Sequence, residues 1–360
     1  MLGNFRYSIK NLCNVLPNMV KYIHSEDRIH ANAKVMKVTV LGAAGRTGKL
    51  LSLLLKRSNI VDELAVYDAL PMDSLALELN HVDNRCRVSG YSGISEIQDA
   101  LKNSKVVLIT AGNPARFGRN QGDLIRTNAK ILNDLVSHVV EHSPRAMLAL
   151  VTSPLNILLP MIGEMYKKAG HYDLNNIFGV TTLDCVRSNT FAAEILGIPP
   201  ETVIVPVIGG NSSDTCVPLF SHMTPGCKLT NAEIETLTLS VKSANEELLK
   251  IYNGIGSPSL GMAFAAARFC VSLCKGLRGV PGVVECAYVR SRVVPDVRYF
   301  ASPLELGPSG IQRNLGVPRL TNHECEMLEY AIPFLRDAIN IGENLALRSK
   351  TTSAEVLLAG

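Results

Sequence analysis

The feature that most constrains the fold is a glycine-rich turn that joins an apolar run to a helical pattern. The β-branched run at residues 38–41 leads directly into Gly42-Ala-Ala-Gly45-Arg-Thr-Gly48. A second apolar run follows the helical pattern and ends at Asp68, which lies 20 residues after Gly48. A strand, a glycine loop, a helix and a second strand that ends in an acid predict a parallel βαβ unit.

The same loop predicts a dinucleotide site. Residues without side chains let a pyrophosphate approach the backbone, and the helix that follows offers unpaired N–H groups and the positive end of its dipole. An aspartate at the end of the second strand can accept hydrogen bonds from both hydroxyls of the adenosine ribose, and its charge would repel the extra phosphate of NADP. We therefore expect NAD as the cofactor, held by Gly42, Gly45, Arg46, Thr47, Gly48 and Asp68.

Two other interpretations compete with this one. Gly48-Lys49 resembles a nucleotide P-loop, but five residues rather than four separate Gly42 from Gly48, and Leu50 replaces the hydroxyl that would bind magnesium. The glycines could also serve only to pack the helix tightly against the strand. Dinucleotide binding is favoured because it explains the loop, the helix and the acid together.

Alternating strand and helix patterns indicate the fold class. Over residues 35–179, buried runs at 37–41, 63–67, 105–110 and 146–151 alternate with helical patterns at 49–57, 72–82 and 122–142. This alternation predicts an α/β fold with a Rossmann-type, doubly wound parallel sheet that carries helices on both faces.

The pattern changes after about residue 180. Helical patterns at 183–196, 231–252 and 259–274 mix with strand patterns at 202–208 and 282–288, and a last helix is predicted from residue 322 to about 347. Residues 180–347 therefore predict an α+β substrate domain, followed by a tail at 348–360. The apolar helix that ends at Cys274 carries Arg268 in its middle, so we expect it to be buried within the protein and expect no membrane span.

Residues 1–34 predict a mitochondrial transit peptide and a location in the mitochondrial matrix. The first 25 residues contain three bases and no acid, and Phe5, Ile9 and Leu12 recur near helical spacing. A basic, acid-poor, amphipathic leader is typical of import signals. Pro17 would break such a helix, so an ordinary disordered arm is the alternative.

The charge distribution argues against a nucleic-acid binder. The chain has a formal net charge of +4, of which residues 1–34 contribute +3, so the body is nearly neutral at +1. A nearly neutral body lacks the basic surface with which proteins bind nucleic acids. Arg278, Arg290, Arg292 and Arg298 could form a local patch, and a third hypothesis, an RNA-associated scaffold, depends on this patch alone.

The chain offers few residues for metal or redox chemistry. Its nine cysteines include no Cys-x-x-Cys pair, as is typical of a reducing compartment, and Cys270 and Cys274 are expected in the core. His138 and His142 share a helical face and could hold a metal, but the sequence indicates no third ligand nearby. We therefore predict no metal site.

The longer motifs resemble those of the malate dehydrogenases, specifically the mitochondrial type. The resemblance covers roughly residues 36–345, and its most specific part is Ile177-Phe-Gly-Val-Thr-Thr-Leu-Asp-Cys-Val-Arg-Ser-Asn-Thr190. Further matches are Val40-Leu-Gly-Ala-Ala-Gly45, Val66-Tyr-Asp68, Val205-Pro-Val-Ile-Gly-Gly210 and Gly282-Val-Val-Glu-Cys286. The resemblance implies a homodimer with an NAD-binding domain, which also uses Thr110, Ala111 and Gly112, and a catalytic domain.

The family's reaction moves a hydride between NAD and the alcohol carbon of malate. A histidine held by an aspartate moves the hydroxyl proton, three arginines hold the two carboxylates, and an asparagine before a proline fixes the hydroxyl and the nicotinamide. The resemblance implies that Asp184 and Arg187 are the retained aspartate and one of the arginines.

The other positions depart from the family. Asn211 stands in place of the histidine, Ser153 in place of the asparagine, and Ala115 and Gln121 in place of two arginines on a mobile loop. Arg116 and Arg119 lie in the same loop, offset from the expected positions, and could substitute for one carboxylate contact.

These departures predict weak chemistry. An amide does not titrate near neutral pH, so Asn211 cannot act as a general base, and Asp184 could accept the proton only through a water. Loss of a positioned acid or base costs about 10²–10⁴ in rate, and each missing arginine removes about 1.5–3 kcal/mol. We expect a protein that binds NAD but has lost efficient malate and oxaloacetate turnover, with a sensing or structural role among unidentified partners in a mitochondrial assembly. The alternative is an active NAD-dependent dehydrogenase for malate or another 2-hydroxy acid, with altered substrate or mechanism.

Overall fold

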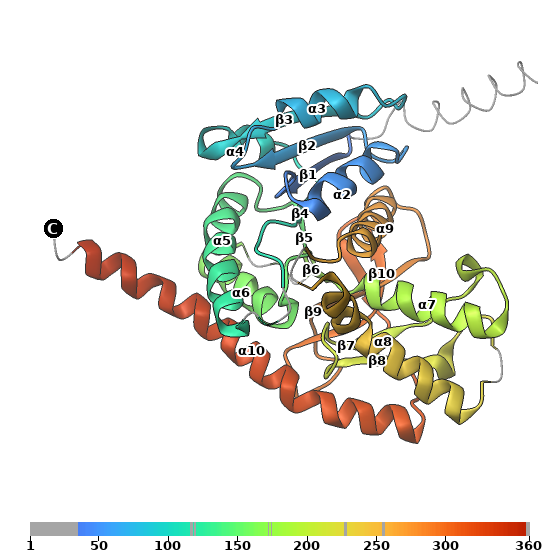
Figure 1. Cartoon of the computed structure of the whole chain (residues 1–360). Helices are drawn as coiled ribbons and strands as arrows, with labels where there is room; N and C mark the ends of the chain where they lie inside the picture. The colour runs from blue at the N-terminus through green and yellow to red at the C-terminus, as the bar shows by residue number, and fades with distance from the viewer. Residues whose placement is uncertain are drawn as a thin grey trace, which may run out of the picture. The chain divides into compact units, whose positions relative to one another are not determined.

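The computed structural model describes residues 35–357 except 116–117, 119, 172, 174, 227–228 and 254–255, and of residues 348–357 only the backbone. The predicted transit peptide at residues 1–34 lies outside the described residues. From Met36 onward the chain forms one unit around an 11-stranded sheet. The strands follow the order β3-β2-β1-β4-β5-β6-β9-β10-β7-β8, and β11 pairs with β10 (Figure 1).

The first half of the sheet is parallel, as predicted. β1 (Lys37–Leu41) lies between β2 (Glu63–Asp68) and β4 (Val106–Ile109). β3 (Arg87–Ser92) extends the sheet on one side, and β5 (Met147–Leu150) and β6 (Ile177–Val180) extend it on the other. Because the strand order changes direction between β1 and β4, the loops that follow these two strands open onto one crevice. The predicted Rossmann-type fold is confirmed.

Five helices connect these strands. They are α2 (Arg46–Lys56), α3 (Asp73–Asn80), α4 (Gly93–Leu101), α5 (Gln121–His142) and α6 (Leu155–Lys168). The sequence patterns predicted α2, α3 and α5 but missed α4 and α6. Residues 155–163 of α6 are all buried, so this helix shows no polar face by which an amphipathic pattern could be detected.

The second half of the sheet is antiparallel. β9 (Val283–Arg290) pairs with the last parallel strand, β6, and β10 (Tyr299–Gly307) pairs with β9, β7 (Val207–Gly209) and β11 (Gly310–Asn314). β8 (Cys216–Pro218) ends the sheet beside β7. The sheet is therefore continuous across the predicted domain boundary at residues 179–180.

Four long helices belong to this second half. They are α7 (Thr182–Leu196), α8 (Asn231–Tyr252), α9 (Leu260–Leu277) and α10 (Asn322–Leu357). The strand predicted at 202–208 is confirmed only at Val207 and Ile208. Residues Pro200–Thr202 form a 3₁₀ turn, and only Val207–Gly209 joins the sheet, because Pro199, Pro200 and Pro206 have no N–H to donate to a strand ladder.

Hydrophobic residues pack on both faces of the sheet. On one face, Leu132 and Val136 of α5 and Leu158 of α6 pack with Leu335 of α10. On the other face, Leu51 and Leu55 of α2 pack with Phe269 and Leu273 of α9. Figure 1 shows α10 running past α6, and α2 near α9.

Helix α9 is long and apolar enough to cross a membrane by length and composition, and half of its residues are buried inside the protein. It packs against α2, α7 and β10. Arg268 in its middle donates from Nε and Nη2 to the buried Glu285 of β9, at 3.0 and 3.1 Å. These contacts agree with the prediction that α9 is a buried helix.

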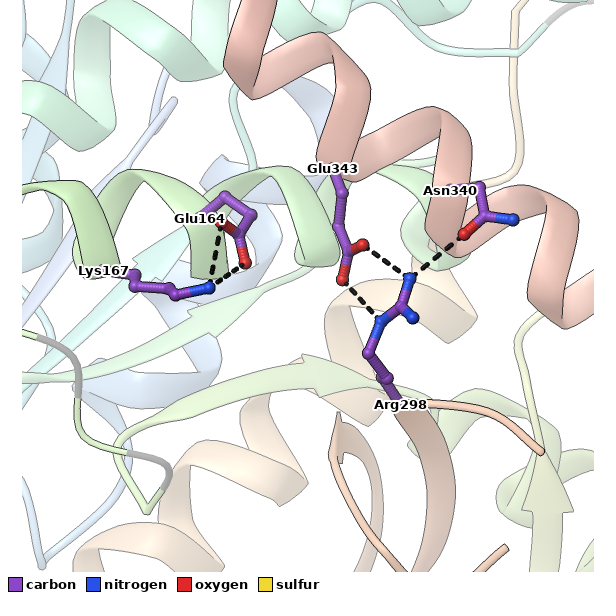
Figure 2. Close-up of polar contacts among 5 residues, drawn as sticks. All are labelled: Glu164, Lys167, Arg298, Asn340 and Glu343. Atoms are coloured by element: carbon purple, nitrogen blue, oxygen red, sulfur yellow. Dashed lines mark hydrogen bonds and ion pairs between the residues drawn. The ribbon is translucent and has the colours of Figure 1, made fainter. Parts of the chain in front are cut away.

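Two arginines of the predicted basic patch form ion pairs on different elements. Arg298, which precedes β10, donates to both carboxylate oxygens of Glu343 at 3.0 and 2.7 Å, and to Asn340, and so ties β10 to α10 (Figure 2). Arg278, which follows α9, donates to Asp62 at 2.6 Å. Their charges are thus partly neutralised by acids, which weakens the case for a basic patch.

Candidate active site

A cavity of about 770 Å³ lies between the glycine loop and the helices of the second half of the chain. Gly45, Arg46 and Thr47 line it from the glycine loop and the start of α2. The chain after β4 contributes Thr110, Gly112, Asn113 and Ala115, the chain after β5 contributes Ser153, and α7 contributes Leu183, Val186 and Arg187. The structure therefore brings the predicted cofactor loop and one predicted substrate residue to the same cavity.

The three glycines of the loop face different surroundings. A Cβ atom on Gly42, whose φ is +94°, would lie 2.4 Å from the backbone nitrogen of Ala111. A Cβ atom on Gly48 would lie 2.2 Å from the carbonyl oxygen of Gly42. At Gly45 the nearest atom would be that same oxygen at 3.3 Å, and Gly45 lines the cavity. Gly42 and Gly48 are thus needed for packing, whereas Gly45 has a single close neighbour and faces the cavity, where a ligand can approach its backbone.

Hydrogen bonds hold this loop in place. Asp68 Oδ2 accepts from the backbone N–H of Ala44 at 2.9 Å, and Thr110 Oγ1 donates to the carbonyl oxygens of Leu41 and Gly42 at 3.1 Å each. No side chain caps the N-terminus of α2, and its first turn carries no acid. Its first N–H groups and dipole are therefore available to an anion, and Asp68 can still accept further hydrogen bonds because each carboxylate oxygen has two lone pairs.

Asp184, Arg187 and Asn211 form a polar cluster at the start of α7, in which Asp184 is buried and the other two are half-buried. Asp184 Oδ2 accepts from Asn211 Nδ2 at 3.0 Å, and Asp184 Oδ1 lies 3.6 Å from Arg187 Nη1. Burial raises the pKa of Asp184 to about 6, although Arg187 and Asn211 both act in the opposite direction. Burial also lowers the pKa of Arg187, which Asp184 partly offsets. Arg187 lines the cavity, whereas Asp184 and Asn211 are not among the residues that line it.

Asn156, which the sequence patterns did not indicate, holds the backbone of Asn211. Asn156 Oδ1 accepts from the backbone N–H of Asn211 at 2.9 Å, and Asn156 Nδ2 donates to Thr215 Oγ1 at 3.0 Å. A Cβ atom on Gly210 would clash with both side chains, so the chain passes close to them here. Asn156 follows Ser153-Pro154 by two residues, but no periodicity distinguishes it from a surface asparagine.

Asn128 of α5 was also missed, and it holds two segments of the cavity wall. Its Oδ1 accepts from the backbone N–H of Asn113 at 2.7 Å, and its Nδ2 donates to the carbonyl oxygens of Asn113 and Ser153 at 3.0 and 2.8 Å. Asn128 is fully buried. A signal for it exists in the sequence, because it lies one turn from both Leu124 and Leu132 on the apolar face of its helix.

The two loop positions at which the family carries arginine differ in their relation to the cavity. Ala115 lines the cavity, whereas Gln121 is the first residue of α5, is exposed, and does not line the cavity. Arg116 and Arg119 lie outside the described residues, so their role as substitutes stays a prediction.

Histidines elsewhere do not replace the missing base. His222 Nε2 lies 2.7 Å from the carbonyl oxygen of Arg319, at the chain segment that precedes α10. Among the described residues that line the cavity there is no histidine. The proton chemistry of the site therefore depends on Glu247, whose carboxylate lines the cavity, and on Asp184, which contacts Arg187 and Asn211.

Comparison with known proteins agrees with this arrangement. Residues 36–179 match the model of the lactate/malate dehydrogenase NAD-binding domain, and residues 181–346 match that of the lactate/malate dehydrogenase α/β C-terminal domain. The chain is 42% identical over 314 residues to the mitochondrial malate dehydrogenase of Rattus norvegicus and 43% identical over 314 residues to that of Sus scrofa, in each case over 87% of this chain and 93% of the relative. A crystal structure of the lactate dehydrogenase of Cryptosporidium parvum with lactic acid and NAD shares the fold, with a TM-score of 0.74 and 22% identity over 87% of this chain and 99% of that one.

Proposed function

Because the chain belongs to the lactate/malate dehydrogenase family, we propose that it binds NAD(H) and a substrate carboxylate in this cavity and that its hydride transfer with malate is strongly slowed. The hydrogen bond from Asn211 to Asp184 carries the second half of the proposal. It places an amide where the resemblance implies the proton-transferring histidine.

The glycine loop supports NAD binding. The cavity beside Gly45 admits a pyrophosphate against the uncapped start of α2, and Asp68 at the end of β2 can accept the ribose hydroxyls. When bound, NADH would supply the hydride. The 36–179 match to an NAD-binding domain supports the same cofactor.

Arg187 supports binding of a carboxylate. Its side chain is 12% exposed and lines the cavity, and the partly buried guanidinium can bind a carboxylate through two parallel N–H donors. Asp184 Oδ1 lies 3.6 Å from Arg187 Nη1 and so helps to hold the guanidinium in place.

Among the described residues that line the cavity there is no histidine, and the one carboxylate is that of the exposed Glu247 on α8. The Asn211 amide can donate a hydrogen bond to Asp184 but has no titratable nitrogen near neutral pH. A positioned acid or base contributes about 10²–10⁴ in rate, so we expect malate turnover lower by at least about this factor. Ala115 and Gln121 add a further loss, because neither can hold the second carboxylate.

We also propose a location in the mitochondrial matrix and assembly as a homodimer. The relatives above are mitochondrial proteins, and residues 1–34 have the composition of an import signal. With little turnover, the protein would act as a sensor of NAD(H) or as a structural member of a larger mitochondrial assembly.

Restoration of the missing residues tests the proposal. NADH binding to the purified chain is first measured by fluorescence titration. The triple variant with Asn211→His, Ala115→Arg and Gln121→Arg is then compared with the wild type in the reduction of oxaloacetate by NADH. We expect the wild type to bind NADH and turn over poorly, and the variant to gain at least about 10²-fold in kcat. Wild-type turnover equal to that of ordinary malate dehydrogenases would contradict the proposal.

A second candidate is a working NAD-dependent 2-hydroxy acid dehydrogenase with an altered substrate. The comparisons favour it, because both family models match and the relatives are named dehydrogenases, and none of these observations indicates lost activity. Arg187 can hold a single carboxylate, and Ala115, Leu183, Val186 and Phe191 make part of the cavity wall apolar. These features favour a 2-oxo acid with an apolar side chain over a dicarboxylate.

Turnover assays separate the two candidates. Oxidation of NADH by the wild type with oxaloacetate, pyruvate and phenylpyruvate is measured side by side. Brisk turnover with either monocarboxylate supports the second candidate, and negligible turnover with all three supports the first.

A further inference from the structure

Three potential metal ligands meet on the last turns of α5. His138, Glu141 and His142 each bring one ligand atom into a group whose atoms all lie within 4.8 Å of one another. None of the three lines the candidate active-site cavity. The helical spacing of the sequence indicates the two histidines as a pair, and the structure adds Glu141 as a third potential ligand.

Helix geometry brings the three side chains together. Residues three and four apart share one face of a helix, so both Glu141 and His142 reach the neighbourhood of His138. The two imidazole rings are stacked with their centroids 5.9 Å apart and their planes inclined by 12°. His142 Nε2 lies 3.9 Å from Glu141 Oε2. Small side-chain rotations would therefore bring the three groups around one ion.

The helix backbone that carries the cluster is fixed by the core, and the cluster itself is accessible to solvent. Val139 and Val140 pack in the hydrophobic core, which fixes the helix beneath the cluster. His138 and His142 are half-buried, whereas the Glu141 side chain is 70% exposed. An ion can thus enter from solvent and find two imidazoles whose backbone positions are already set.

Neither the hydrogen bonding nor the helix end opposes a cation. His138 Nδ1 is buried and has no hydrogen-bond partner among the described residues, so no protein group there fixes the tautomer of this ring. Helix α5 ends at His142, and the carbonyl groups and negative dipole end of the last helical turn favour positive charge.

We propose that His138, Glu141 and His142 form a binding site for a divalent transition-metal ion, with Zn²⁺ as the fitting ion. Two imidazoles and one carboxylate are a ligand set that zinc uses with a fourth position left open. Mg²⁺ and Ca²⁺ fit poorly because they take oxygen ligands. The ion would link three side chains on the last turns of α5. Water or a group of another molecule would fill its open coordination position.

Zinc titration of the full chain tests this site. Isothermal titration calorimetry with ZnCl₂ is compared for the wild type, His138→Ala, His142→Ala and Glu141→Gln, with His171→Ala as a control that removes an exposed histidine elsewhere. We expect one strong site in the wild type and in the control, and at least about tenfold weaker binding when any of the three ligands is changed, since loss of even an outer-shell partner costs about 10–100-fold.

Two further measurements keep the outcome clear. Absorption of the Co²⁺-loaded wild type shows whether a thiolate such as the exposed Cys325 binds instead, because thiolate ligands add an intense near-ultraviolet band that imidazole and carboxylate lack. The imidazole NMR signals of the wild type are followed during addition of Zn²⁺, a measurement that does not depend on the folding of any variant. Only the signals of His138 and His142 should shift. Thiolate absorption, unshifted signals of these two histidines, or equal affinity of the His138→Ala and wild-type chains would overturn the proposal.

Discussion

Asn211 supplies a hydrogen bond to a buried carboxylate without offering a titratable nitrogen. Asp184 is buried, and a buried carboxylate without a hydrogen-bond donor would cost several kcal/mol. The Nδ2 group of Asn211 supplies that donor at 3.0 Å, as one N–H of an imidazole could. The amide therefore satisfies the carboxylate, but it offers no nitrogen that could accept a proton.

The buried state of Asp184 predicts a pH dependence of stability. Its pKa is about 6 in the folded protein against an ordinary value of 3.8. Between these two values the folded protein keeps a proton that the unfolded chain has released, so the free energy of unfolding falls as pH rises. At about 1.4 kcal/mol per pH unit, the wild type should lose up to about 3 kcal/mol between pH 4 and pH 7 relative to Asp184→Asn.

Urea unfolding of both chains at several pH values measures this difference. Asp214→Asn removes an exposed carboxylate three residues after Asn211 and serves as the control, with a pH profile expected to match the wild type. If wild type and Asp184→Asn show parallel profiles, the carboxylate does not titrate in this range.

Helices position the loops of the site from outside it. Asn128 on α5 binds the chain after β4 and the chain after β5, and Asn156 on α6 binds the chain after β7. Each of these residues satisfies backbone groups of a loop that has no regular partner. The loops that line the cavity are therefore held in place by hydrogen bonds to rigid, packed helices.

Removal of the Asn128 amide should destabilise both the segment after β4 and the segment after β5, which line the cavity. Asn128→Ala leaves the N–H and carbonyl of Asn113 and the carbonyl of Ser153 without this partner, and we expect a loss of roughly 2–4 kcal/mol in the free energy of unfolding. Chemical denaturation measures the loss, and NADH affinity should fall as well. Lys130→Ala, an exposed change on the same helix, should cost less than about 0.5 kcal/mol. Equal stability of the two variants would mean that water replaces the amide.

On the scale of the whole molecule, the cavity is lined by residues from both the parallel and the antiparallel half of the chain. Its walls include Gly45 near β1 and Met262 on α9, which are far apart in the sequence. The Arg46 guanidinium lies so close to Gly256 that a Cβ atom there would be 2.1 Å from Nη1. A ligand in the cavity thus contacts both parts and should stabilise them together.

NADH should raise the stability of the whole chain. At a free concentration 100 times its Kd, a ligand that binds only the folded state adds about 2.7 kcal/mol. Gly45→Ala should fold with a modest loss, because φ at Gly45 is −66° and the carbonyl oxygen of Gly42, 3.3 Å from the new Cβ, must move by only a few tenths of an ångström. The methyl group would occupy the pyrophosphate side of the loop. Thermal unfolding with and without NADH should show stabilisation of the wild type and little of the variant. A variant stabilised as much as the wild type would place the cofactor elsewhere.

Local sequence was sufficient for the parts of this protein that depend on neighbouring residues. The glycine loop, Asp68 at the end of its strand and the helical repeats of α2, α5, α8 and α9 follow from backbone sterics and side-chain periodicity. These properties act within one or two turns of chain, so they can be read in order. The family motifs also located Asp184, Arg187 and Asn211 without any structure.

Tertiary structure decided the contacts between distant segments that the family motifs do not imply. Asn156 meets Asn211 across 55 residues, and Asn128 meets Ser153 across 25, through hydrogen bonds that no periodicity predicts. The antiparallel pairing of β6 with β9 likewise joins segments about 100 residues apart into one sheet. Such partners are selected by the packing of the core and by the need to satisfy buried polar groups, and both are properties of the folded chain as a whole.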